Sequence, residues 1–138
     1  MDCERQNHKS VVVTLSQKLY AIRLQEHLAH AKTLSNKGDY VQAGEKIWGA
    51  LSALVNSRLI PEAKAVDHKK KRFLSLFNSY LMRTPNLRSQ MRQLGLKNDD
   101  EVFHAIYGLH KFFYGGANYN NQYLSKIVPF LISLIEKL

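Results

Sequence analysis

Apolar side chains recur at helical spacing along most of this 138-residue chain, and this periodicity restricts the fold more than any other feature of the sequence. In residues 15–37 the stripe contains Leu24, Leu28 and Leu34, and residues 121–138 repeat leucine, isoleucine and valine nearly as a heptad. Strand patterning is confined to the three valines at 11–13. The sequence therefore predicts an all-α fold.

Glycine and acidic residues indicate where these helices begin and end. Gly38 suits the left-handed cap that closes a helix, and Asp39 with Gln42 suits the start of the next, so residues 15–37 and 40–58 should pack antiparallel. Further helices are expected over residues 62–82, 98–114 and 121–138, with a short one at 87–94. We expect a four-helix up-down bundle with one additional short helix over residues 11–138, preceded by a flexible tail at 1–10.

The net charge of +9 is concentrated in one segment of the chain. Residues 58–97 contain ten lysines and arginines and only two carboxylates, a net +8, which leaves +1 for the rest. Such a segment attracts polyanions, and basic residues three or four positions apart share one helix face. The nucleic-acid-binding residues that this pattern predicts are Lys69, Lys70, Lys71, Arg72, Arg88 and Arg92.

The single cysteine and the short apolar runs favour a soluble protein of a reducing compartment. Cys3 has no disulfide partner within one chain, and no run reaches the ~20 apolar residues that cross a bilayer. No spacing of cysteine and histidine suits a metal, and no glycine-rich loop suits a phosphate. We expect a cytoplasmic protein with no membrane contact, no metal and no cofactor.

Two blocks of this sequence resemble a known family. Residues 37–50 read KGDYVQAGEKIWGA, similar to the GDYxQAxEKxWxA text that the archaeal PaREP family carries at a helix–helix turn. Residues 109–114 read LHKFFY, similar to the LHxxFY text of the same family, and the resemblance extends from about Leu15 onward. It implies a HEPN-like helical bundle, a group whose members are often dimers and act near nucleotides or RNA.

The resemblance also implies where an active site would lie. HEPN ribonucleases carry an arginine and a later histidine on a late helix with four to six residues between them, and the matching histidine here is His110. Positions 103–105 hold no arginine, and His104 is the only basic residue among them. We therefore expect a non-catalytic module that binds nucleic acid or nucleotide. The alternatives are a metal-independent ribonuclease of toxin–antitoxin type, with a nucleotidyltransferase-like partner protein, and a protein–protein interaction bundle.

The residues around His110 are expected to line a pocket, a dimer seam or a hydrogen-bonded edge of the core. Tyr107, His110 and Tyr114 fall at i, i+3 and i+7 and therefore share one helix stripe. The homodimer that the resemblance implies should include the helix at 98–114 in its seam. Glu45 is expected to be a surface charge. Three further aromatic residues are expected in the core: Trp48, Phe103 and Phe113.

Overall fold

The computed structural model describes residues 2–58, 65–115 and 119–138, with side chains from Leu15 onward in the first of these ranges. Within these ranges the chain forms six helices and no strand, so the all-α prediction is confirmed. The helices are α1 (Asp2–Asn36), α2 (Tyr40–Arg58), α3 (Val66–Arg83), α4 (Leu87–Gln93), α5 (Asp99–Phe113) and α6 (Asn121–Lys137).

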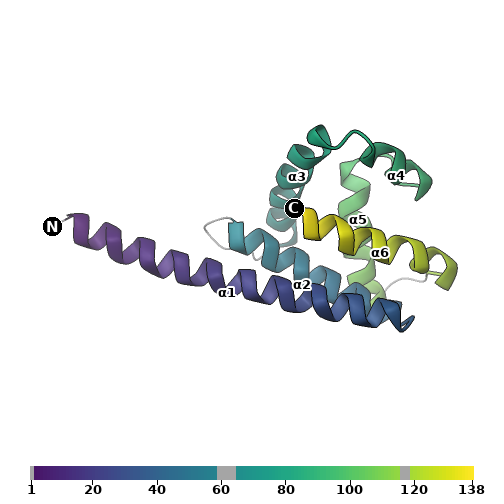
Figure 1. Ribbon diagram of the computed structural model, residues 1–138, viewed down its shortest axis with the longest axis horizontal. Helices are drawn as coiled ribbons and strands as arrows, with labels where there is room; N and C mark the ends of the chain where they lie inside the picture. The colour runs from purple at the N-terminus through teal and green to yellow at the C-terminus, as the bar shows by residue number, and fades with distance from the viewer. Residues whose placement is uncertain (1, 59–64, 116–118) are drawn as a thin grey trace.

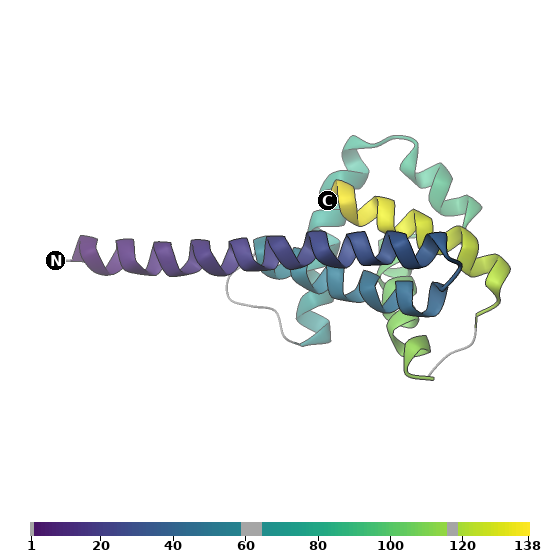
Figure 2. The same ribbon diagram turned by 60° about the horizontal axis from the view of Figure 1, so that its bottom comes forward.

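The first two helices form an antiparallel hairpin, as the sequence predicts (Figure 1 and Figure 2). Gly38 in the turn has a positive φ of 80°, which glycine adopts without a steric clash. The backbone amide of Gln42 donates to Asp39 Oδ1 over 3.3 Å and so caps the start of α2. Small residues are completely buried on both helices, including Ala31 on α1 and Ala43 on α2, so the two backbones approach closely.

The first helix begins at Asp2 rather than near Leu15, so the tail expected over residues 1–10 is helical from its second residue. The start near Leu15 was predicted because the apolar stripe begins there. A helix that is already nucleated, however, gains one backbone hydrogen bond for each residue added, without needing a packed stripe. The N-terminal half of α1 consequently extends past the end of α2 and away from the other helices (Figure 1 and Figure 2).

The remaining helix boundaries lie close to those expected from the sequence. The expected start of the third helix, at residue 62, falls outside the described ranges, and α3 is observed from Val66. The start of α5 is capped twice, because Asn98 Oδ1 accepts from the Glu101 amide over 3.0 Å and the Glu101 carboxylate accepts from the Lys97 amide over 2.5 Å. Asn78 of α3 donates from its side-chain amide to Asp99 Oδ2 over 2.9 Å, which joins α3 to the start of α5.

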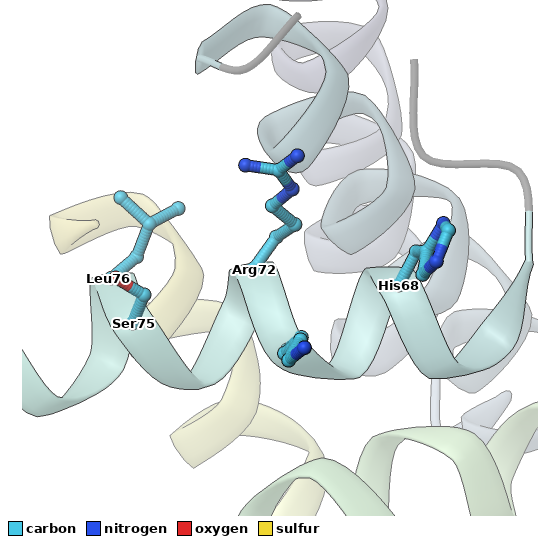
Figure 3. A pocket seen from close by; sticks show the side chains of 5 residues that line it. His68, Arg72, Ser75 and Leu76 are labelled. Atoms are coloured by element: carbon cyan, nitrogen blue, oxygen red, sulfur yellow. The ribbon is translucent and has the colours of Figure 1, made fainter. Parts of the chain in front are cut away.

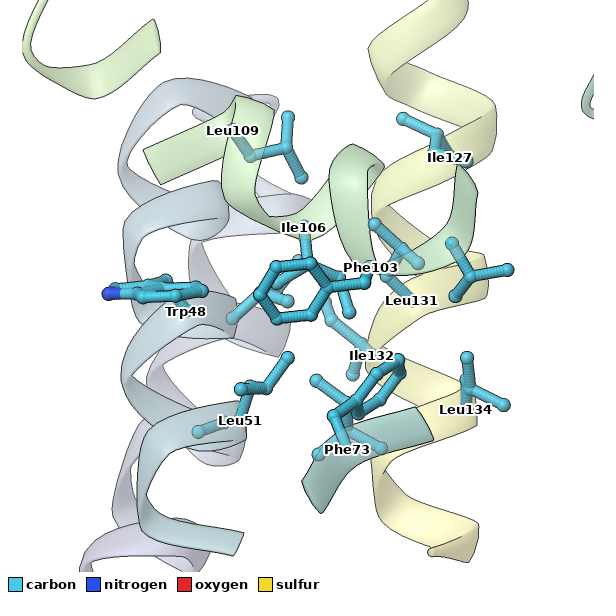
Figure 4. Close-up of a cluster of buried hydrophobic side chains, with 14 of the residues drawn as sticks. Trp48, Leu51, Phe73, Phe103, Ile106, Leu109, Ile127, Leu131, Ile132 and Leu134 are labelled. Atoms are coloured by element: carbon cyan, nitrogen blue, oxygen red, sulfur yellow. The ribbon is translucent and has the colours of Figure 1, made fainter. Parts of the chain in front are cut away.

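The core lies where α5 crosses α2 and α6, with α3 closing one side (Figure 1 and Figure 4). Phe103 and Ile106 of α5, Leu131 of α6 and Phe73 of α3 all point into it and are at most 1% exposed. Trp48 of α2 lies at the edge of this cluster, and its indole nitrogen points away from it (Figure 4). The edge at Trp48 is where the core meets the candidate site.

Two of the three aromatic residues expected in the core are found there. Trp48 is 8% exposed and Phe103 is 1% exposed. Phe113 is 40% exposed, so its expected burial is wrong. It is the last residue of α5 and lies one turn beyond Leu109, the last residue of that helix to be buried.

Candidate functional site

The two sequence blocks that resemble the PaREP family meet in space, although 65 residues separate their facing side chains. Glu45 of α2 and His110 of α5 are joined by a hydrogen bond of 2.7 Å between Oε2 and Nδ1. The ring of Trp48, one turn along α2, stacks on the His110 ring with centroids 5.0 Å apart and planes at 25°. We call this group of three side chains the Glu45–His110–Trp48 cluster.

A close approach of α2 and α5 positions this cluster. A Cβ atom at Gly44 would lie 2.9 Å from Leu109 Cβ, so only glycine allows the two backbones to come this near. Gly44 and Leu109 directly precede Glu45 and His110 in the chain, so the same contact brings the carboxylate and the imidazole together. Glu45 is therefore a half-buried partner of His110, and its expected role as a surface charge is wrong. Its position three residues before Trp48, on the same helix face, was the sequence signal for it.

The predicted stripe on α5 is present around His110. Tyr107 stacks on His110 with centroids 5.9 Å apart, and Tyr114 meets it edge-on at 5.2 Å. The ring centroids of Tyr107 and Trp48 are also close, 5.3 Å apart. Tyr114 is 69% exposed, so the stripe runs from the core edge out to the surface. Nδ1 of His110 is held by Glu45, which leaves Nε2 as the ring nitrogen with no bond from the described residues.

His104 is held by different partners. Its Nε2 atom lies 3.0 Å from Asp100 Oδ2, and the Lys70 ammonium of α3 lies 2.5 Å from Asp100 Oδ1. The Lys70 ammonium, hydrogen-bonded to Asp100, lowers the pKa of that carboxyl below its ordinary value. His104 thus belongs to a contact between α3 and α5, whereas His110 belongs to a contact between α5 and α2. The two histidines do not form one acid–base pair within a single chain.

The basic residues predicted to bind nucleic acid fall into two groups. Lys69 lies 5.3 Å above the Trp48 ring in a cation–π contact, and Lys70 is paired with Asp100, so both face the body of the protein. Lys71 and Arg72 instead line a surface hollow of about 400 Å³ along α3, together with His68, Ser75 and Leu76 (Figure 3). We call this the α3 hollow. Sequence reasoning missed His68 and Ser75, although each lies four residues from a predicted binding residue on the same face.

A second basic hollow lies beside α4. Arg88 and Arg92 line it with Lys97, Met91 and Leu96, and its volume is about 240 Å³. All three of its basic side chains belong to exposed residues. We call this the α4 hollow. Four of the six predicted residues therefore line surface hollows, and the other two tie α3 to α2 and α5.

Metal and membrane sites were also sought among the described residues. Within that part of the chain no three side chains of histidine, cysteine, aspartate or glutamate come together as metal ligands. None of the described helices combines the length and the apolar character that crossing a bilayer requires.

Comparison with known proteins gives one family. The model of the archaeal PaREP1/PaREP8 family matches residues 19–127, which is most of the chain. The chain belongs to this family. The matched range contains both blocks, the Glu45–His110–Trp48 cluster and the two hollows. No curated protein and no solved structure matches the chain.

Proposed function

We propose that this protein is a non-catalytic module that binds nucleic acid through its phosphates, using the α3 and α4 hollows. The observation that carries this proposal is the lining of the α3 hollow. Lys71, Arg72, His68 and Ser75 offer an ammonium, a guanidinium, an imidazole and a hydroxyl on one face of α3 (Figure 3). These are the groups that donate hydrogen bonds to phosphate oxygens in protein–nucleic acid complexes.

The position of the hollows on the helices supports this role. Phe73, Phe77 and Leu81 form the buried face of α3, and at 100° per residue the residues of the hollow lie on the opposite face. Their charge is therefore free to meet a ligand without loss of the core. Contacts of this kind are indifferent to base sequence, because phosphates are the same at every nucleotide.

The residue at position 104 and its partner support a non-catalytic role. Position 104 holds a histidine where the ribonucleases of the HEPN group carry an arginine, and that histidine is already bound by Asp100. A HEPN-like arrangement of the helices is part of this proposal, supported by the α1–α2 hairpin and by the meeting of the two sequence blocks. The domain would then present phosphate-binding residues without the arginine that such cleavage uses.

The test is binding of mixed-sequence RNA and DNA oligonucleotides, followed by fluorescence anisotropy at low and high salt. Four phosphate contacts predict a slope of about −3.6 for log K against log salt on duplex DNA, or a loss of about 100-fold between roughly 50 and 200 mM salt. The test variant replaces with glutamine four of the lysines and arginines that line the hollows: Lys71, Arg72, Arg88 and Arg92.

A matched control removes the same charge from elsewhere. It replaces with glutamine four exposed lysines outside both hollows: Lys18, Lys37, Lys126 and Lys137. We expect the hollow variant to lose the salt dependence and most of the affinity, while the control keeps at least the slope of the wild type. Absence of binding by the wild type at low salt, or equal loss in the two variants, contradicts the proposal.

One observation favours a second function, a metal-independent ribonuclease. Glu45 holds His110 Nδ1 at 2.7 Å, and a carboxylate that fixes an imidazole in this way is the arrangement of a general acid–base histidine. This function predicts RNA cleavage in the presence of a chelator, lost in both His110→Ala and Glu45→Gln. RNA that stays intact with the wild type leaves the non-catalytic module as the function.

A further inference from the structure

The first helix carries two apolar stripes on opposite faces. Leu24 and Leu28 lie on the face that packs on the rest of the protein, where Leu28 is 3% exposed. Leu15, Leu19 and Ile22 are 56–57% exposed. At 100° per residue these three lie roughly 140–180° around the helix from Leu24, so they face away from α2. We call them the α1 stripe.

This stripe lies where α1 passes the end of α2, and the part of α1 that precedes it extends away from the other helices (Figure 1 and Figure 2). Three large apolar side chains that are more than half exposed on one helix face form a surface that a partner can cover. The spacings of four and three residues between Leu15, Leu19 and Ile22 are those of the a and d positions of a coiled coil.

We propose that the occupant of the α1 stripe is the same stripe of a second copy of this chain, paired antiparallel. The distribution of charge favours a second copy. Residues 1–30 carry four lysines and arginines and three carboxylates, so this segment has a net +1 of the total +9. Two copies can therefore meet along α1 with little repulsion, whereas contact between their bodies brings two strongly positive surfaces together.

An antiparallel arrangement follows from the same charges. It places the two basic bodies at opposite ends of the paired helices, while a parallel arrangement places them side by side. In the antiparallel register Leu15 of one copy lies opposite Ile22 of the other, and the two Leu19 side chains lie next to each other at the centre.

The α1 stripe offers more exposed apolar surface for a homodimer seam than α5, the helix that was expected to form the seam. The apolar residues of α5 are occupied by the core of a single chain, with Val102, Phe103, Ile106 and Leu109 at most 2% exposed. Only Phe113 and Tyr114, at the end of that helix, remain exposed as large apolar side chains. The pairing through α1 does not depend on nucleic-acid binding.

Sedimentation velocity of the full chain tests this proposal. We expect a concentration-dependent dimer for the wild type between about 1 and 100 µM. Leu19→Glu removes two central leucines from the dimer and should weaken it by about 100-fold. Met82→Glu is the matched control, because Met82 is 86% exposed and lies on α3, far in sequence from the stripe. It should dimerise as the wild type does.

Circular dichroism of each variant separates loss of pairing from loss of folding, and Leu19→Gln repeats the test without a new charge. Two outcomes overturn the proposal: a monomeric wild type at 100 µM or so, which leaves the stripe to a different protein, and a Leu19 variant that dimerises as well as the wild type. The direction of pairing is tested by oxidising an equal mixture of Leu15→Cys and Ile22→Cys chains, each also carrying Cys3→Ser. Antiparallel pairing gives the mixed disulfide, whereas parallel pairing gives only disulfides between identical chains and refutes the arrangement.

Discussion

Two glycines of α2 allow a sharp comparison of how its neighbours respond to an added methyl group. A Cβ atom at Gly44 would lie 2.9 Å from Leu109 Cβ, and one at Gly49 would lie 2.9 Å from the Cε1 atom of the His27 ring. The two contacts are equally short. They differ in what must move, because Leu109 Cβ is bonded directly to the backbone of α5, whereas the His27 ring is the far end of a side chain that can rotate.

The expected magnitudes follow from two opposing terms. Replacing glycine by alanine inside a helix stabilises it by about 1 kcal/mol, and overpacking a rigid core contact costs about 1–3 kcal/mol. Gly44→Ala should therefore lower the free energy of unfolding by up to about 2 kcal/mol, since α5 as a whole must shift. Gly49→Ala should leave the free energy of unfolding unchanged or raise it by up to about 1 kcal/mol, since the imidazole can turn aside.

Urea unfolding of both variants, followed by circular dichroism, measures the difference. Tryptophan fluorescence adds a local probe, because Trp48 is the only tryptophan and stacks on His110 beside Gly44. Its emission should change in Gly44→Ala and stay as in the wild type in Gly49→Ala. Equal destabilisation by the two substitutions would show that the rigidity of the neighbour does not decide the cost.

Three further substitutions probe charge and burial. The Lys70 ammonium holds the Asp100 pKa below its ordinary value, so the Asp100 carboxylate stabilises the folded state, and this stabilisation is lost as the pH falls through the folded-state pKa. Asp100→Asn should therefore lose less thermal stability at acid pH than the wild type, as measured by thermal unfolding at a series of pH values. Burial, and after it the nearby Lys46 charge, lowers the His27 pKa below its ordinary 6.5. The wild type should therefore lose stability as the pH falls below 6.5, because the unfolded chain then binds a proton more readily than the folded one. His27→Gln should not show this loss. Ser52→Ala should raise the free energy of unfolding by about 1 kcal/mol in urea titrations, because the buried hydroxyl has no partner among the described residues.

Much of the helical architecture could be predicted from local sequence alone. The start of α2 was expected at Tyr40 and is observed there, because Gly38 and Asp39 act on backbone groups within a few residues of themselves. The end of α2 at Arg58 is also the expected one. The same holds for the start of α5, where Asn98 and Glu101 satisfy neighbouring amides. The start of α1 was placed 13 residues too late, because the absence of an apolar stripe does not stop a helix that is already formed.

The candidate sites depended on contacts between distant residues, which only the tertiary structure decides. The pattern of positive charge was evident in the sequence, but Lys70 is paired with Asp100 of α5, thirty residues away, while Lys71 lines the α3 hollow. Glu45 became the partner of His110 because Gly44 lets α2 approach α5. Helical periodicity determines which face a residue occupies, since that depends on its neighbours in the chain. What covers that face depends on how the helices cross, and no local spacing encodes it.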